Sequence, residues 1–270
     1  MISFANAKIN LGLSITEKRP DGYHNIETIF YPIHLYDVLE FNSSDTYGFE
    51  ALGIQIPGNG DNLCTKAYTL LKSDFPQIHP VSIKLLKNIP IGAGLGGGSS
   101  DAAFVLKALN EMNKLGLTST QLQAYAKMLG ADCAFFIENK PLFAEGIGTE
   151  FSPIDLDLKD YYIVVVKPDI HISTAEAYAN ITPQIPQVDL KRAIQLPIQE
   201  WKYHITNDFE LGIFEKYPLI REIKQKLYEK GALYAAMSGS GSAVFGIFED
   251  NVTLDEMEHM GKLFYPIELT

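Results

Sequence analysis

The sequence predicts an α/β protein built from two domains. Its 270 residues and 46% hydrophobic content allow one large core or two modest ones, and typical domain sizes favour two. A strand pattern at 81–87 passes through a glycine-rich segment directly into a helical pattern. A second strand pattern at 161–167 starts a new series of elements. We therefore place a linker at about 152–160 and expect domains over 1–155 and 156–270.

The first domain is expected to begin with β-structure and continue with helices. Residues 1–60 alternate apolar stretches with turn signals, which is typical of a largely antiparallel β-region. Thr118 and Gln121 form a possible capping box, and Gly130 is a natural helix end. The expected elements are helices over about 62–75, from the glycine-rich segment to about 114 and over 118–129, then a short strand over 133–137 and a loop around 143–148.

The second domain is expected to mix helices with strands. Helical patterns cover about 174–180, 190–196 and 219–230, and strand patterns cover 233–237 and 243–248. The last two strands are separated by a second glycine cluster, SGSGS at Ser238–Ser242. It can be a hairpin turn or a close approach of the backbone to a ligand, and the two interpretations are compatible.

Composition excludes several classes of partner. The net charge of −11 argues against binding of nucleic acid or anionic membranes, which require a basic surface. The longest apolar run, 161–166, is too short to cross a bilayer, and the first residues lack the pattern of a signal peptide. We therefore expect a cytoplasmic protein, with no obligate protein partner inferred. Cys64 and Cys133 fit neither a metal site nor a disulfide framework and are expected to be buried thiols.

The segment Pro90–Ser100, here called the glycine loop, predicts an anion site. It reads PIGAGLGGGSS and is followed by Asp101, which suits the first turn of the next helix, as Ser99 or Ser100 suits its cap. Glycine lacks a Cβ, so successive amides can approach a ligand, and the start of a helix adds free N–H groups. A polyphosphate is the expected ligand.

The glycine loop differs from two familiar phosphate-binding loops. A Walker A loop is excluded because no lysine lies between Pro90 and Asp101. The dinucleotide pattern GxGxxG is present at Gly92, Gly94 and Gly97, but the strand ending in an acidic residue that should follow is missing. A nicotinamide-binding oxidoreductase therefore remains an alternative only.

Two charged residues are candidates for chemistry at a bound triphosphate. Asp132 follows a helix end and precedes an apolar run, where it could accept a hydroxyl proton or simply stabilise a turn. Lys8 lies within an apolar strand pattern beside Asn10, where lysines usually extend to solvent. A Lys8–Asp132 pair would keep the carboxylate ionised and offer positive charge to a transferring phosphoryl group.

Aromatic residues could bind a planar base. The segment RPDGYH is a turn by composition, and it places Tyr23 and His24 directly after Asp-Gly. Tyr178, on a predicted helix, could supply an opposing ring.

Six segments occur in an order that resembles a known family. AKINLGL, RPDGYH, PIGAGLGGGSSDAA, LGADCAFF, AEGIG and SGSGSAVFGIF together resemble the GHMP small-molecule kinases over nearly the whole chain. DGYH and GADCAFF are similar to the branch that acts on a cytidyl diphosphate substrate rather than on mevalonate, galactose or homoserine. Another small-alcohol kinase of the family is the alternative.

The resemblance implies an N-terminal domain like the second domain of ribosomal protein S5, a ferredoxin-like C-terminal domain, and ATP as phosphoryl donor with Mg²⁺. Lys8 and Asp132 match the catalytic pair, Asn10 a substrate contact near the reacting hydroxyl, and Tyr23, His24 and Tyr178 the cytidine clamp. The ATP-binding positions are matched by Asn62, Lys66, Pro90, Ile91, Gly92, Ala93, Gly94, Leu95, Gly96, Gly97, Gly98, Ser99 and Ser100.

Three positions show small departures from the family pattern. Ala93 and Asp101 stand where relatives can carry glycine and asparagine, and Tyr178 occupies a position where phenylalanine also occurs. An acidic Asp101 near phosphate could contact helix amides or the metal. No metal ligand is marked beyond Ser99 or Ser100.

Overall fold

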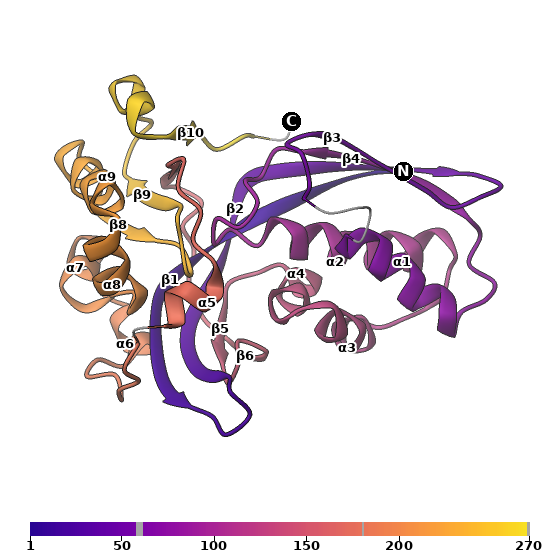
Figure 1. The fold of residues 1–270 in the computed structure, drawn as a ribbon, viewed down its shortest axis with the longest axis horizontal. Helices are drawn as coiled ribbons and strands as arrows, with labels where there is room; N and C mark the ends of the chain where they lie inside the picture. The colour runs from indigo at the N-terminus through magenta and orange to yellow at the C-terminus, as the bar shows by residue number, and fades with distance from the viewer. Residues whose placement is uncertain (58–61, 180, 269–270) are drawn as a thin grey trace. The chain divides into compact units, whose positions relative to one another are not determined.

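The computed structural model describes residues 1–57, 62–179 and 181–268, and the chain divides into two compact units (Figure 1). The first unit comprises Met1–Ala7, Leu35–Ile91 and Gly96–Lys140, and the second comprises Lys8–His34, Gly92–Leu95 and Pro141–Thr270. No helix in the described ranges is both long enough and apolar enough to cross a membrane.

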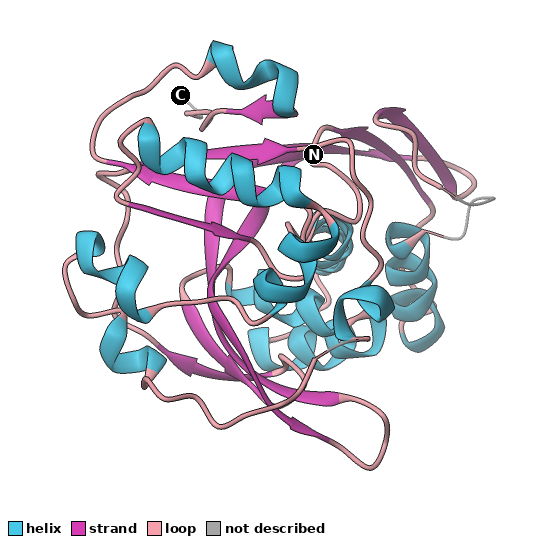
Figure 2. Ribbon diagram, turned by 60° about the vertical axis from the view of Figure 1, so that its left-hand side comes forward, coloured by secondary structure: helices cyan, strands magenta, loops and turns pink. Residues whose placement is uncertain are grey.

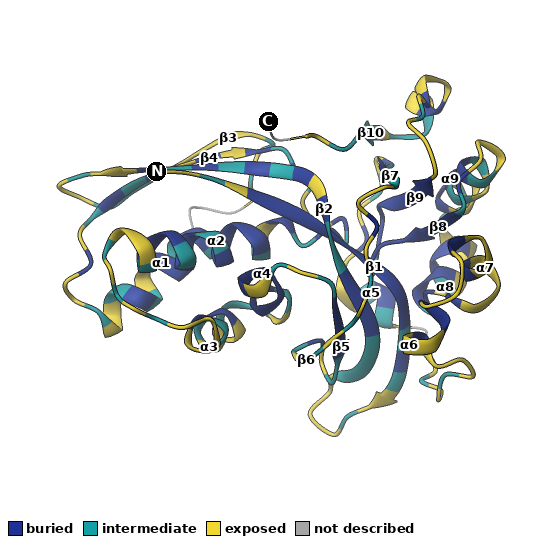
Figure 3. Ribbon diagram, turned by 180° about the vertical axis from the view of Figure 1, so that it is seen from behind, coloured by how far each residue is buried: buried dark blue, intermediate teal, exposed yellow. Residues whose placement is uncertain are grey.

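The first unit contains a sheet with one covered face. Its strands come from β1 (Ile2–Lys18), β2 (His24–Ser43), β3 (Gly48–Gly53) and β4 (Val81–Lys87). The C-terminal part of β2 pairs antiparallel with β4, and β3 pairs parallel with β4. Every second residue of β4 is buried, ending with Lys87, while the residues between them are partly or fully exposed (Figure 3).

Helices cover the face of this sheet to which the buried side chains of β4 belong (Figure 1). They are α1 (Leu63–Asp74), α2 (Gly97–Met112), α3 (Ser119–Leu129), the 3₁₀-helix η1 (Ala131–Ala134) and α4 (Phe135–Glu138). The helix α2 packs against α1, α3 and α4 and buries a stripe that includes Val105 and Leu109 (Figure 1). The glycine loop therefore leads into the most buried helix of the unit.

The second unit is built around an antiparallel four-stranded sheet in the order β10, β7, β9, β8. Its strands are β7 (Tyr162–Lys167), β8 (Tyr234–Met237), β9 (Val244–Phe248) and β10 (Lys262–Phe264). The N-terminal part of β2 pairs separately with β5 (Leu142–Glu145), which pairs with β6 (Glu150–Pro153).

Helical segments complete the described part of the second unit; Figure 2 colours the helices cyan. They are α5 (Thr174–Tyr178), α6 (Leu190–Ala193), α7 (Ile198–His204), α8 (Phe209–Lys216), α9 (Pro218–Glu229) and η2 (Asp255–Met260). α9 begins with proline and buries Ile220, Ile223 and Leu227, which recur on one face. Together with β7, β8 and β9 these side chains form the core of the unit.

Most predicted elements are confirmed. β4 has the predicted bounds, and α3 has the predicted capping box between Thr118 and Gln121 and ends at Gly130. The helices predicted over 62–75, 190–196 and 219–230 and the strands β7, β8 and β9 are present, as is the β-rich start. Two predictions reach beyond the described residues: the β-region includes 58–60, and the helix predicted over 174–180 ends at residue 180.

Other predictions are corrected. The strand predicted over 133–137 is wrong, because η1 and α4 occupy those residues. A run of five apolar residues has no visible period, so a buried helical turn and a buried strand have the same sequence pattern. The loop predicted around 143–148 is partly strand, since β5 continues to Glu145. The helices α7 and α8 and the strand β10 were not predicted.

Candidate active site

The glycine loop leaves the start of α2 open. Gly92, Gly94 and Gly96 have φ values of +62°, +78° and +69°, a region that only glycine enters without strain. Gly96 is the N-cap residue of the 16-residue helix α2, and it makes no side-chain cap hydrogen bond within the described structure. The predicted cap at Ser99 or Ser100 is wrong, because both serines lie inside the helix. An uncapped helix start offers its first amides to an anion.

A buried cluster of charges lies beneath this helix start in the first unit. The Lys87 ammonium donates to Asp37 and forms an ion pair with Asp101 Oδ2 at 3.1 Å. A Cβ on Gly97 would meet Lys87 Nζ at 2.9 Å, so the cation lies directly against the first residue of α2. Asp37 Oδ1 also accepts from the amide of Ile89 at 2.8 Å. The cluster ties the end of β4 to the helix after the glycine loop.

Asp101 is the least satisfied member of the cluster. Its Oδ1 has no hydrogen-bond partner among the described residues, and the side chain is almost fully buried. Burial raises the pKa of Asp101 to about 8; Lys87 opposes this shift, and Asp37 adds to it. The sequence suggested that Asp101 contacts helix amides or a metal, and the structure instead pairs it with Lys87.

In the second unit, β1 presents Lys8 and Asn10 from its interior. Lys8 is only 3% exposed, so it does not extend to solvent as lysines in strands usually do. Its amide donates to Leu95 O of the glycine loop at 3.0 Å, and its ammonium donates to Asn10 Oδ1. The Asn10 side chain donates in turn to Thr28 Oγ1 at 3.0 Å. The lysine is therefore held beside Asn10 by an ordered network.

The second glycine cluster packs on the glycine loop. It connects β8 to β9 as a hairpin, as one interpretation of the sequence predicted. Ser238 Oγ donates to Gly94 O at 2.8 Å and accepts from the amide of Asn10 at 3.2 Å. The amide of Ala243 donates to Ala93 O at 3.2 Å. The hairpin thus contacts the glycine loop itself, which sequence reasoning did not foresee.

Two of the three aromatic candidates lie together. The rings of His24 and Tyr178 stack with centroids 4.7 Å apart and planes 21° apart. Tyr178 also makes an edge-to-face contact with Phe209 at 4.8 Å. Tyr23 is 63% exposed in the turn before β2. Rings in direct stacking contact leave no room for a base between them, so a planar ligand must open the stack or bind on its outer face.

Comparisons with known proteins assign the family. The family model for the GHMP kinases N terminal domain matches residues 62–140, and that for the GHMP kinases C terminal matches 194–266. A protein of Bacteroides thetaiotaomicron is 57% identical over 263 residues, covering 96% of each chain. The chain belongs to the GHMP kinases. That relative and one from Bacteroides fragilis, 55% identical with both chains fully covered, are named 4-diphosphocytidyl-2-C-methyl-D-erythritol kinase.

Solved structures of GHMP kinases agree with the fold. The crystal structure of a 4-(cytidine 5'-diphospho)-2C-methyl-D-erythritol kinase superposes with a TM-score of 0.82 at 32% identity and covers 98% of each chain. A mevalonate kinase superposes with a TM-score of 0.69 at 16% identity, again over 98% of each chain, which supports the fold alone. The predicted two-domain α/β fold is thereby confirmed.

The catalytic pair expected of a GHMP kinase is described in separate units. Lys8 belongs to the second unit and Asp132 to the first, so the pairing of the two side chains stays a prediction. Asp132 is half-buried in η1, directly after the end of α3 at Gly130. The next residue, Cys133, is fully buried, and η1 packs against α2.

The predicted adenine-pocket residues lie at the start of α1. Asn62 is the N-cap of this helix, and its Oδ1 accepts from the amide of Thr65 at 2.9 Å. Lys66 is exposed one turn later. The structure thus gives Asn62 a role in fixing the helix start, while an adenine contact for either residue stays a prediction.

Sequence reasoning missed the buried charges. Lys87 and Asp37 both fall on the inward-facing positions of their strands, in register with Leu85 and Leu39. A charged residue on the apolar face of an alternating strand is a visible signal, because such a side chain must find a partner. The partner Asp101 could not be read from the pattern, since it lies on a helix separated in sequence.

Bound magnesium would need oxygen donors. Among the described residues, no group of three or more His, Cys, Asp or Glu side chains could hold a metal ion. Ser100 Oγ is a buried hydroxyl without a hydrogen-bond partner in the same residues. Ser99 is half-buried one residue earlier. A serine hydroxyl fits a hard cation that keeps most of its contacts to phosphate and water.

Proposed function

We propose that this GHMP kinase transfers the γ-phosphoryl group of ATP to the 2-hydroxyl of 4-diphosphocytidyl-2-C-methyl-D-erythritol, giving the 2-phosphate and ADP. This reaction belongs to non-mevalonate isoprenoid precursor synthesis. Relatives with 55–57% identity over at least 96% of the chain carry the name of this kinase. An identity this high over the full length supports a shared substrate better than the fold does, because the same fold hosts several kinases.

The observation that carries the ATP part of the proposal is the uncapped start of α2. Three glycines in the left-handed region precede it, and the buried Lys87 ammonium lies against its first residue. Backbone amides and the positive end of a 16-residue helix suit the negative charge of a polyphosphate. We assign Pro90–Ser100 to the phosphates, with Asn62 and Lys66 near adenine.

The chemistry is assigned to Asp132 and Lys8. The substrate hydroxyl oxygen attacks the γ-phosphorus, the bond from that phosphorus to the bridging oxygen of ADP breaks, and Asp132 accepts the hydroxyl proton. Lys8 offers an ammonium to the transferring group. It is buried at 3% exposure and held by Asn10, so its position costs little reorganisation during the reaction. Asn10 is assigned to the substrate near its reacting hydroxyl.

Bound magnesium would neutralise charge on the β- and γ-phosphates. Ser99 or Ser100, at the start of α2, is the proposed protein donor. The amides of the same helix start would hold the phosphate oxygens on the other side.

The cytidine end of the substrate is assigned to Tyr23, His24 and Tyr178. His24 and Tyr178 already stack, and Tyr23 is exposed one residue before His24. Aromatic rings bind a nucleobase through face contacts, and the imidazole adds a hydrogen-bonding edge.

Three further expectations belong to this proposal. The N-terminal kinase domain would end near residue 155, and the C-terminal domain would begin at 156. The family matches at 62–140 and 194–266 fall on either side of that boundary. The enzyme would act in the cytoplasm on small molecules, without nucleic acid, membrane or an obligate protein partner.

Coupled ADP release tests the proposal. The protein is offered the cytidyl substrate, mevalonate, homoserine or galactose, each with ATP and Mg²⁺. We expect turnover with the cytidyl substrate and little with the other three. Turnover with one of the other alcohols alone would assign a different kinase of the family. ATP binding without ADP release on any alcohol would contradict the enzymatic proposal, and NADH binding without ATP binding would favour the nicotinamide alternative.

A further inference from the structure

Four consecutive residues at the junction of the α7–α8 loop and the start of α8 contact separate elements of the second unit. They are Asn207, Asp208, Phe209 and Glu210, here called the 207–210 segment. Asn207, Phe209 and Glu210 are each less than 9% exposed. None was singled out by the sequence, because their partners lie far away along the chain.

Asp208 holds the strand β1. Its amide donates to Leu13 O at 2.9 Å, and its Oδ2 accepts from the amide of Ile15 at 2.7 Å. The amide of Leu13 donates to Thr206 O at 2.9 Å. Three bonds to alternate residues of one strand fix its position along its own axis. Lys8 and Asn10 lie on the same strand, so their positions depend on this attachment.

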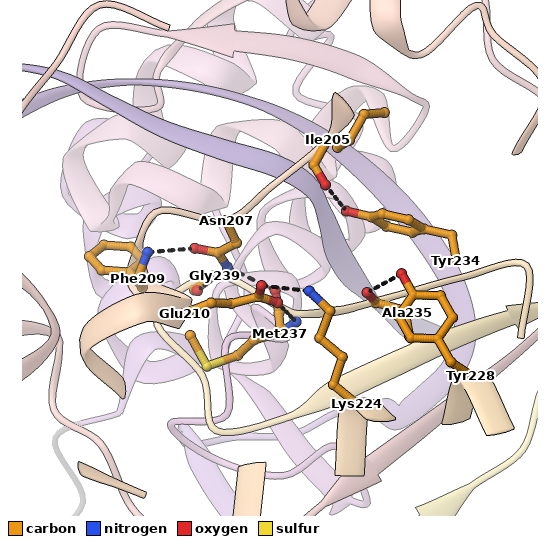
Figure 4. A network of polar contacts seen from close by, with 10 residues as sticks. All are labelled: Ile205, Asn207, Phe209, Glu210, Lys224, Tyr228, Tyr234, Ala235, Met237 and Gly239. Carbon is orange, nitrogen blue, oxygen red and sulfur yellow. Dashed lines mark hydrogen bonds and ion pairs between the residues drawn. The ribbon is translucent and has the colours of Figure 1, made fainter. Parts of the chain in front are cut away.

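Asn207 holds the beginning of the SGSGS hairpin (Figure 4). Its Nδ2 donates to Met237 O and to Gly239 O, both at 2.8 Å, and its Oδ1 accepts from the amide of Phe209 at 3.0 Å. The two donors and the acceptor of the amide are thus all used. An aspartate in its place would replace this NH2 group with one carboxylate oxygen, which would face both carbonyl oxygens without a donor between them.

Glu210 holds the same hairpin through the backbone amide of Met237 (Figure 4). Its Oε1 accepts from the amide of Met237 at 2.8 Å, and its Oε2 accepts from Lys224 Nζ at 2.6 Å. The amide and the carbonyl group of Met237 are therefore both bound by side chains of the 207–210 segment. These bonds fix the backbone position of the next residue, Ser238.

Ser238 connects the hairpin to the glycine loop by a hydrogen bond. Its hydroxyl bridges Asn10 N and Gly94 O, as described above. Gly239 follows with φ +55°, and a Cβ there would meet Asn10 Oδ1 at 3.2 Å. A small shift of the hairpin would therefore break the bridge or displace the side chain that holds Lys8.

Phe209 supports the stacked aromatic pair. Its ring meets Tyr178 edge to face at 4.8 Å, and Tyr178 stacks on His24. Phe209 is 2% exposed and cannot turn away without leaving a cavity. The contact with Phe209 therefore helps to fix the orientation of the Tyr178 ring that stacks on His24.

We propose that the 207–210 segment is a positioning element of the kinase site, in which Asn207 and Glu210 align the glycine loop through Ser238 and Phe209 aligns the cytidine clamp through Tyr178. The inference rests on the proposed function for the meaning of the two subsites. It assigns two separable effects to neighbouring residues. Asn207 acts on phosphoryl transfer, and Phe209 acts on binding of the cytidyl substrate.

The test compares Asn207→Asp and Phe209→Leu by steady-state kinetics with both substrates varied. Asn207→Asp should lower kcat by at least about 10-fold with the KM for the cytidyl substrate nearly unchanged, because misplacement of reacting groups acts mainly on turnover. Phe209→Leu should raise that KM several-fold with kcat nearly unchanged.

Matched controls separate positioning from stability. Asn110→Asp changes an asparagine that clamps Leu117 through its side-chain amide and carbonyl in the first unit. Phe214→Leu is the control for Phe209→Leu, because Phe214 lies on the same helix α8 and in the same hydrophobic core. Both controls should lower the melting temperature while leaving kcat and both KM values near those of the native protein.

Equal fractional losses of activity in all four variants, tracking the folded fraction, would overturn the inference. So would native kinetics in Asn207→Asp. If the native protein releases no ADP with any alcohol, the proposed function fails, and hydrogen exchange then tests the inference alone. Faster exchange at the amides of Asn10 and Ala243 in Asn207→Asp than in Asn110→Asp would support it, and equal exchange would overturn it.

Discussion

The carbonyl oxygen of Ser238 lies 1.9 Å from the position that a Cβ atom on Gly94 would occupy. The backbone of the hairpin therefore fills the space beside this glycine. Gly94 also has φ +78°, so two independent constraints exclude a side chain at this position.

Gly94→Ala should abolish most kinase activity and destabilise the protein. The left-handed conformation alone costs an alanine about 1 kcal/mol, and the overlap with Ser238 adds to it by pushing the two loops apart. ADP release and thermal unfolding measure both effects. Gly116→Ala is the control, since Gly116 has φ +71° and an added Cβ there would meet no described atom within 4 Å beyond its own chain neighbours. It should show the conformational cost with native activity; equal activity losses in both variants would contradict the role of the contact.

Asp132→Asn should lower turnover by about 10²- to 10⁴-fold, because the amide cannot accept the hydroxyl proton. Affinity for ATP, measured by calorimetry, should change little, since the phosphates are assigned to backbone amides. Asp157→Asn, at an exposed carboxylate paired only with Lys159 among the described residues, is the control and should behave as the native protein. Native turnover in Asp132→Asn would remove the base assignment.

Tyr178→Ala should weaken binding of the cytidyl substrate selectively. Loss of one stacked ring costs about 1–3 kcal/mol, which corresponds to at least about a fivefold rise in KM for that substrate. The KM for ATP should stay constant, and Tyr178→Phe should restore near-native values because the ring face remains. An unchanged KM for the cytidyl substrate in Tyr178→Ala would place the base elsewhere.

The stability of the protein should fall with rising pH through the titration of Asp101. Burial raises the pKa of this carboxyl in the folded protein to about 8 from its ordinary value of 3.8, so the folded state binds the proton more tightly than the unfolded state. Its contribution is fully present below about pH 4 and is lost as the pH rises through about 8.

Thermal unfolding across pH 5 to 9 measures this dependence, and the difference between native protein and Asp101→Asn isolates it. The variant should lose the part of the pH dependence that comes from Asp101, since an amide does not titrate. Parallel curves for the two proteins would show that Asp101 is ionised in the folded state throughout, held by Lys87.

Local sequence chemistry predicted the surroundings of the glycine loop well. The strand at Val81–Lys87 and the capping box at Thr118 and Gln121 are set by neighbours in sequence, so their patterns were sufficient. The start of α2 was misplaced because two serines suggested a cap, whereas the glycine before them adopts the cap position and leaves it without a side chain.

Contacts across long sequence separations could not be predicted. Asn207 binds carbonyl groups 30 and 32 residues away, and Ser238 reaches Gly94 across 144 residues. Asn207 carries no local signal, and the SGSGS pattern around Ser238 indicated a turn or a ligand contact but not its partner Gly94. The strand pattern at 81–87 places Lys87 on the same face as Leu85, a signal that was overlooked, and only the fold shows that Asp37 and Asp101 are its partners.

Both cysteines are buried, as expected, and both belong to the first unit. Burial raises the pKa of the Cys133 thiol to about 11 and that of Cys64 well above its ordinary value, so neither thiolate forms readily in the native protein. Alkylation of Cys64 and Cys133 should therefore proceed only as fast as the first unit opens and exposes its interior. ATP should slow this alkylation.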